Sequence, residues 1–148
     1  MKEYILVFML EPAPIGARFT MWSLHMTLLP WFNAPDFELV FAKLKQKLER
    51  FEPFEIEAGG PSQMGHRNLP AKLINNSPKL QSMHDALLRM IVENDWDLQG
   101  RYTGQHFKPH VTRKKGMDAN GKYFLDAVYI VEKQSQGYRE IVGKVDLA

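Results

Sequence analysis

The chain has 148 residues, which is the usual length of one domain. It is 45% hydrophobic and 24% charged, so it can bury a core, and a mainly disordered state is excluded. Because it has no cysteine, a disulfide scaffold, a thiolate zinc site, an iron–sulfur cluster and a cysteine nucleophile are excluded as well. The net charge of +2 is too small for nucleic-acid binding by bulk charge, so any anion site must be local.

The first half of the chain is predicted to hold three strands and one helix. Residues 4–10 form an apolar run that is too short to span a bilayer, and we expect a buried strand of a cytoplasmic protein there. Residues 22–31 are the second predicted strand. Apolar residues recur at steps of three and four over residues 35–51, which predicts an amphipathic helix. Alternation over residues 54–58 predicts a strand that stops at Gly59.

The second half is predicted to hold one helix among four strands. The helix opens at Ser77 and runs to about Trp96, with a proline in its first turn. The predicted strands cover residues 71–75, 106–113, 123–132 and 138–147, with a loop over residues 99–105. Strands therefore arrive in pairs and helices singly. This favours an α+β fold with largely antiparallel sheets, in a single domain spanning residues 1–148.

Two of the five histidines lie in the same local pattern. His25 precedes Thr27 by two positions, and His110 precedes Thr112 by two, although the chain has only four threonines. Residues two apart in a strand share a face, so each pair presents an imidazole beside a hydroxyl while its neighbours face the core. Two imidazoles can divide the roles of general acid and base, and hydroxyls can hold phosphoryl oxygens. The pairs therefore fit the cleavage of a phosphodiester without a metal.

A basic and aromatic segment surrounds the second pair. It carries five positive charges and no acidic residue, on Arg101, Lys108, Arg113, Lys114 and Lys115. Aromatic rings beside cations suit the base and phosphate of a nucleotide. We therefore expect four residues to contact a substrate: Arg113, Tyr102, His106 and Trp22. A solvated basic face and a core tryptophan are the alternatives.

The remaining two histidines are expected to have structural rather than catalytic roles. His66 lies in a polar, glycine-containing stretch and is expected to be an exposed loop residue. His84 falls on the edge of the apolar stripe of the second helix and is expected to be packed. Neither is therefore predicted to take part in the chemistry.

The motifs His25-Met26-Thr27-Leu28 and Pro109-His110-Val111-Thr112-Arg113 resemble those of the two-histidine (2H) phosphoesterase superfamily, which includes bacterial 2′-5′ RNA ligases that act as RNA 2′,3′-cyclic phosphodiesterases. The resemblance in element order covers nearly the whole chain. It implies two pseudo-symmetric lobes of largely antiparallel sheet with flanking helices, which enclose a groove where the motifs meet.

The resemblance also implies an activity. It is metal-independent hydrolysis, without a cofactor, of a 2′,3′-cyclic phosphate or a 2′,5′-phosphodiester on an RNA end or a small cyclic nucleotide. His25 and His110 would be general acid and base in an order that the sequence leaves open. Thr27 and Thr112 would bind the phosphate oxygens.

Two other functions compete with this one. A non-catalytic RNA- or nucleotide-binding module of the same fold is the alternative, and the intact histidines and threonines favour the enzyme. A metalloprotein that uses His25 and His110 is disfavoured, because no nearby carboxylate supplies a third ligand. No membrane association and no obligate protein partner is inferred.

Overall fold

The computed structural model of the chain describes residues 1–100 and 102–148. Its elements in chain order are β1 (Lys2–Met9), β2 (Arg18–Phe19), β3 (His25–Ala34), α1 (Phe37–Leu48), β4 (Phe54–Met64), β5 (Leu69–Ile74), α2 (Pro78–Glu93), β6 (Asp97–Leu98), the 3₁₀ turn η1 (Gly104–His106), β7 (His110–Thr112), β8 (Lys122–Leu125), β9 (Ala127–Lys133), the 3₁₀ turn η2 (Ser135–Gly137) and β10 (Arg139–Asp146). This order confirms the predicted α+β class.

The strands join into one sheet with the order β2-β10-β9-β1-β3-β7-β5-β4-β8, and β6 pairs with β3. Every strand pairing among the described residues is antiparallel. β3 and β7 carry the two histidine motifs, and they are neighbours where the two halves of the sheet meet. Topology thus brings together two segments that are far apart in the sequence.

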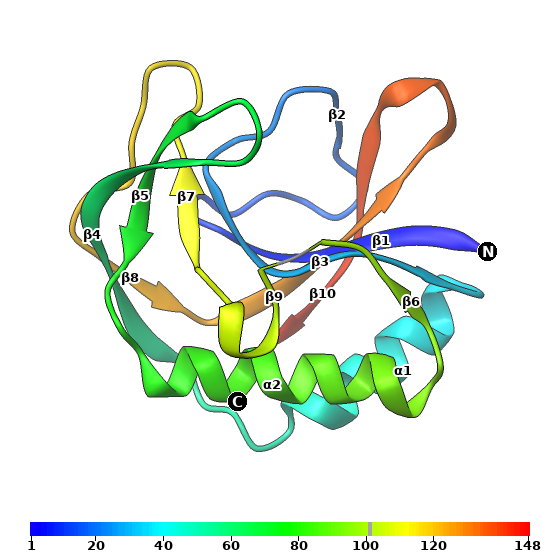
Figure 1. Cartoon of the computed structure of the whole chain (residues 1–148). Coiled ribbons are helices and arrows are strands. Elements are labelled where there is room, and N and C mark those ends of the chain that lie inside the picture. Colours follow the sequence, from blue (N-terminus) through cyan, green and yellow to red (C-terminus); the bar gives the residue numbers. More distant parts are fainter. Residues whose placement is uncertain (101) are drawn as a thin grey trace.

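Both helices cover the same face of the sheet and lie side by side below it (Figure 1). Helix α1 begins after Asp36, whose carboxylate accepts the N–H of Leu39 at 2.9 Å. Helix α2 begins after Ser77, whose hydroxyl accepts the N–H of Leu80 at 3.2 Å, and Pro78 stands in its first turn as predicted. Their apolar stripes are buried against the sheet.

The apolar run of β1 is buried on both faces of the sheet. Alternate residues belong to the core beneath the helices: Tyr4, Leu6 and Phe8. The residues between them belong to a second apolar cluster on the opposite face: Ile5, Val7 and Met9. Because neither face meets water, the run shows no polar alternation.

Two predicted strands continue further than expected, and both continue past residues that β-bulges accommodate. The strand predicted over residues 22–31 begins at His25 and continues past Pro30 to Ala34. A register shift against β1 at this point lets the strand tolerate a residue without an N–H. Likewise β4 continues past Gly59 to Met64, because a second register shift follows Ala58.

Two other strands are shorter than predicted. The strand predicted over residues 123–132 is divided at Asp126 into β8, which pairs with β4, and β9, which pairs with β1 and β10. The strand predicted over residues 106–113 covers only His110–Thr112, because residues 104–106 form a 3₁₀ turn and Pro109 cannot donate to a ladder. The short strands β2 and β6 lack a periodic signal and were not predicted.

Candidate active site

The two motif strands present both motifs on one face of the sheet. Met26 of β3 pairs with Val111 of β7, and both are fully buried on the face that the helices cover. One step along this register, the polar residues of the motifs form two cross-strand pairs: His25 with Thr112, and Thr27 with His110. All four are only partly buried, which confirms the alternation predicted from the sequence.

The cross-strand register sets the spacing of these side chains. Directly opposite residues of an antiparallel pair have Cβ atoms about 4.5–5.5 Å apart, and diagonal residues are about 7–8 Å apart. His25 and His110 are diagonal neighbours. A group of the size of a phosphate therefore fits between the two rings, with a threonine hydroxyl beside each.

Both imidazoles are anchored in the same way. His25 Nδ1 donates to the carbonyl oxygen of Ser23 at 2.9 Å, and His110 Nδ1 donates to the carbonyl oxygen of Lys108 at 2.8 Å. A carbonyl oxygen can only accept, so Nδ1 of each ring carries a hydrogen. Among the hydrogen bonds of the described residues, none uses Nε2 of either ring. Nε2 is therefore the atom that can exchange a proton with a ligand.

Burial keeps both imidazoles neutral. It lowers the pKa of His25 to about 4, and repulsion by Lys114, His110 and Arg139 acts in the same direction. Burial also lowers the pKa of His110, together with repulsion by Lys108. The carbonyl acceptors oppose both shifts without overcoming them. Each Nε2 thus offers a lone pair at pH 7.

Trp22 lies directly against His25, although it precedes the strand rather than opening it. The two rings stack with centroids 4.0 Å apart and planes inclined by 28°. Phe19 meets the indole edge-on at 4.7 Å, and the guanidinium carbon of Arg139 lies 5.9 Å from the indole centroid. Trp22 therefore holds one face of the His25 ring in place.

A small pocket of about 190 Å³ opens beside Thr27 and His110. Its lining is mostly apolar and includes two aromatic residues, Tyr102 and Phe107. Tyr102 therefore lies near Thr27 and His110, and its contact with a substrate stays a prediction. His106 does not line this pocket: it is exposed on η1, outside the strand in which it was expected to share a face with His110.

Arg113 is held by an acidic neighbour. Its Nη2 lies 2.8 Å from Oδ2 of Asp118, and its Nε donates to both carboxylate oxygens. The role of Arg113 in substrate binding stays a prediction, and Arg101 lies outside the described residues. Sequence reasoning missed Arg139, because it lies on β10, far along the chain from either motif, where no local pattern marks it.

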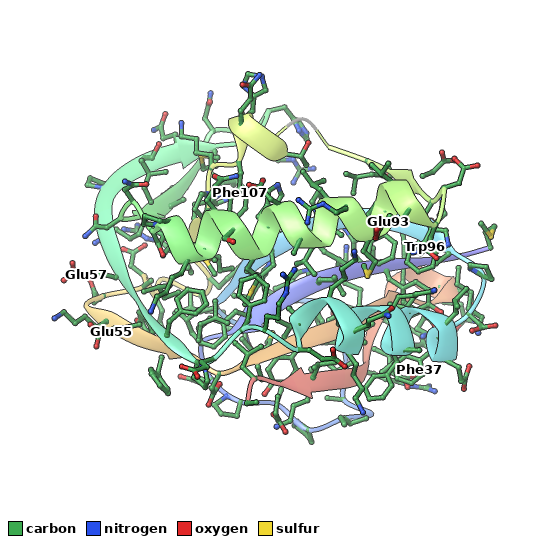
Figure 2. All side chains as sticks on the ribbon, turned by 90° about the horizontal axis from the view of Figure 1, so that it is seen from below. Phe37, Glu55, Glu57, Glu93, Trp96 and Phe107 are labelled. Carbon is green, nitrogen blue, oxygen red and sulfur yellow. The ribbon has the colours of Figure 1, made fainter. Side chains whose placement is uncertain are left out.

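His84 of α2 is packed as predicted, and it also connects the two motif segments. It is fully buried; its Nδ1 donates to the carbonyl oxygen of Leu28 at 2.7 Å, and its Nε2 accepts the N–H of Gly104 at 2.9 Å. Its ring stacks on Phe107 with centroids 3.8 Å apart, and Figure 2 shows Phe107 beside α2. Leu28 belongs to the first motif and Phe107 leads into the second, so one side chain fixes both.

A family model described as the 2′-5′ RNA ligase superfamily matches residues 10–134. The chain belongs to the 2′-5′ RNA ligase superfamily. Membership of this superfamily supports phosphoesterase chemistry in general. No curated protein matches the chain.

Similar solved structures confirm that this superfamily member has the LigT-like 2H phosphoesterase fold. Escherichia coli LigT complexed with 3′-AMP matches with a TM-score of 0.65 and 13% identity, over 99% of this chain and 98% of that one. A structure described as a phosphoesterase matches with the same TM-score, identity and coverage. The protein TT0787 of Thermus thermophilus matches with a TM-score of 0.60 and 18% identity, again over 99% and 98%.

Across residues 1–100 and 102–148 of this 2′-5′ RNA ligase superfamily member, no three His, Cys, Asp or Glu side chains gather closely enough to hold a metal ion. In the same part of the chain, no helix is long and apolar enough to cross a membrane. The groups that the described residues bring to the site are two imidazoles, two hydroxyls and nearby cations.

Proposed function

We propose that the protein is a metal-independent phosphodiesterase that hydrolyses a 2′,3′-cyclic phosphate or a 2′,5′-phosphodiester on RNA or on a small nucleotide. One observation carries this function: Nδ1 of His25 and Nδ1 of His110 are each held by a carbonyl two residues earlier in the chain. Two Nε2 atoms on neighbouring strands are then left to act on either side of one phosphate. General acid–base catalysis requires such a pair.

His25 acts as the base in this reaction, since its imidazole is neutral at pH 7 and its Nε2 has a free lone pair. Its Nε2 accepts a proton from water while the water oxygen bonds to phosphorus. His110 gains a proton when the phosphate binds, because a nearby negative charge raises its pKa. Its Nε2 then donates that proton to the ribose oxygen as the bond from that oxygen to phosphorus breaks. The products are a phosphate monoester and a free hydroxyl.

Thr27 and Thr112 act on the non-bridging oxygens. Each hydroxyl lies opposite one of the histidines on the same face of the sheet. Hydrogen bonds from both hydroxyls stabilise the negative charge that develops on these oxygens as water attacks. The two threonines therefore supply the electrostatic part of the catalysis.

Nucleotides are the substrate class that the surroundings favour. The pocket beside His110 has the aromatic lining that suits a base, from Tyr102 and Phe107. LigT has been solved with 3′-AMP, NADP⁺ and ATP, which are all nucleotides. RNA ends and small cyclic nucleotides present the same ribose phosphate to the two histidines.

The test is hydrolysis of adenosine 2′,3′-cyclic phosphate, and of an RNA with a 2′,3′-cyclic end, in excess EDTA. The wild type should form product despite the chelator, and His25→Ala and His110→Ala should each lose about 10²–10⁴-fold in rate. His66→Ala is the control, because His66 is exposed in the turn between β4 and β5. Full activity in either site variant, or loss of wild-type activity in EDTA, contradicts this function.

A nucleotide-binding module without catalysis is the second candidate. The neutral state of both rings favours it, because the free protein then holds no imidazolium to donate a proton. Under this alternative, calorimetry detects binding of the nucleotides, whereas the assay above yields no product from either substrate. Turnover of either substrate excludes it.

A further inference from the structure

Two cations near His25 have no acidic partner among the described residues: Lys114, just after β7, and Arg139, the first residue of β10. Nε of Arg139 is fully buried and makes no hydrogen bond, and its Nη1 reaches only the carbonyl oxygen of Thr20 at 3.4 Å. A buried donor without an acceptor is costly, more so when it is charged. The chain therefore leaves the guanidinium short of acceptors, and this half-buried side chain is suited to an anionic acceptor from outside the chain.

The acidic residues nearest to these cations along the sequence already bind other arginines. Glu140 follows Arg139, and its carboxylate lies 3.0 Å from Nε of Arg18. Asp118 follows the loop that begins at Lys114, and its carboxylate holds Arg113 at 2.8 Å. Neither carboxylate forms an ion pair with Lys114 or Arg139.

The fold brings both cations to His25: Lys114 follows by two positions Thr112, the residue opposite His25, and Arg139 lies over Trp22, which stacks on His25. They come from different halves of the sheet, since β9, β1 and β3 separate β10 from β7 (Figure 1). Even so, Arg139 lowers the pKa of Lys114, after the larger effect of burial, and both cations lower the pKa of His25. Like charges that the backbone keeps together repel each other, and an anion beside both removes the repulsion.

Arg139 approaches His25 from a different direction than His110 does. His110 stands on β7, which borders β3 on one side, whereas β1, β9 and β10 lie on the other side. Arg139 reaches the site along Trp22, with its guanidinium carbon 5.9 Å from the indole centroid, and Trp22 in turn stacks on His25. An anion at Arg139 is thus offset from a phosphate that sits between the two histidines.

We propose that Lys114 and Arg139 bind a second phosphate of the substrate, on the Trp22 side of His25. This second-phosphate subsite rests on the proposed function and narrows its substrate class. The preferred substrates are nucleotides or RNA ends with another phosphate one ribose away from the reacting one. A terminal 5′-phosphate and the next phosphodiester of an RNA share this chemistry.

Equilibrium binding of product-like ligands tests the subsite without requiring turnover. Calorimetry compares adenosine 2′-phosphate with adenosine 2′,5′-bisphosphate, and with a diadenosine that ends in a 2′-phosphate and carries its second phosphate as a diester. The wild type should bind at least one of the two-phosphate ligands roughly tenfold to a hundredfold more tightly than the monophosphate. This preference should become smaller as the salt concentration rises. Whichever ligand is preferred identifies the source of the second phosphate.

Four variants test which residues cause the preference for a second phosphate. Lys114→Gln and Arg139→Gln should each remove most of it while the affinity for adenosine 2′-phosphate falls much less, and Arg139→Lys should keep part of the preference. Lys115→Gln, next to Lys114 and exposed, is the matched control and should keep the whole preference. Thermal unfolding of each variant establishes that it is folded.

Equal affinity of the wild type for one and two phosphates overturns the subsite. So does an equal loss for all ligands in Lys114→Gln and Arg139→Gln, which would place these cations on the reacting phosphate. A measured preference without turnover of the cyclic substrates retains the subsite and rejects the phosphodiesterase. Turnover of the cyclic substrates without a preference for two phosphates retains the phosphodiesterase and rejects the subsite.

Discussion

Acid should destabilise the protein through His25 by an amount that the structure sets. The pKa of His25 is about 4 in the folded protein, against about 6.5 for a histidine in an unfolded chain. Because the folded pKa is the lower one, the neutral ring is the stabilising form, so stability is retained above pH 6.5 and lost as pH falls toward 4. From pH 7.5 to pH 5.0 this linkage removes about 2 kcal/mol of unfolding free energy.

The assay is urea unfolding of the wild type and of His25→Gln at these two pH values. The pKa of His110 and that of His84 are also lowered by burial, so the wild type loses more than the share of His25 alone. The difference between the two proteins isolates His25: the variant should lose about 2 kcal/mol less. His66→Gln, exposed in its turn, should behave as the wild type. An equal loss in His25→Gln and the wild type would show that the burial of His25 is not a source of the acid sensitivity.

Three further predictions concern neighbouring groups. His84→Leu leaves the carbonyl oxygen of Leu28 and the N–H of Gly104 unpaired, which should cost about 2–6 kcal/mol in urea unfolding; a cost below about 1 kcal/mol would contradict the role of His84 in fixing both motif segments. Arg113→Ala should weaken binding of adenosine 2′-phosphate at low salt and have little effect at high salt, and unchanged affinity at low salt would remove Arg113 from the site. His110→Ala should lose less activity on bis(para-nitrophenyl) phosphate than on the cyclic nucleotide, because the para-nitrophenolate leaving group needs no proton. Equal losses on the two substrates would argue against His110 as the acid.

The faces of the motif strands could be predicted from the sequence, whereas their pairing could not. The two-residue period of a strand places His25 with Thr27, and turns Met26 to the core, without any knowledge of the fold. That β3 and β7 are neighbours follows from the sheet order, which local patterns do not encode. Only the resemblance to a family predicts that the two motifs meet.

The remaining differences come from long-range contacts. Pro30 signals a strand end locally, but a bulge against β1 carries the strand past it. Asp126 divides one apolar run into β8 and β9, which belong to different halves of the sheet. Only the strands with which β8 and β9 pair reveal this division. Arg139 acts on His25 from β10, and no spacing in the sequence links the two residues. Such contacts depend on how the whole sheet assembles.

Shared acid–base catalysis by His25 and His110 is best tested by a double-variant cycle on hydrolysis of adenosine 2′,3′-cyclic phosphate in EDTA. Rates are compared for the wild type, His25→Ala, His110→Ala and the double variant. If the two rings move protons in one step, removal of either already stops the coupled transfer, and the double variant should be about as slow as each single one. Losses that multiply in the double variant would show that the rings act independently, and would contradict a shared acid–base mechanism.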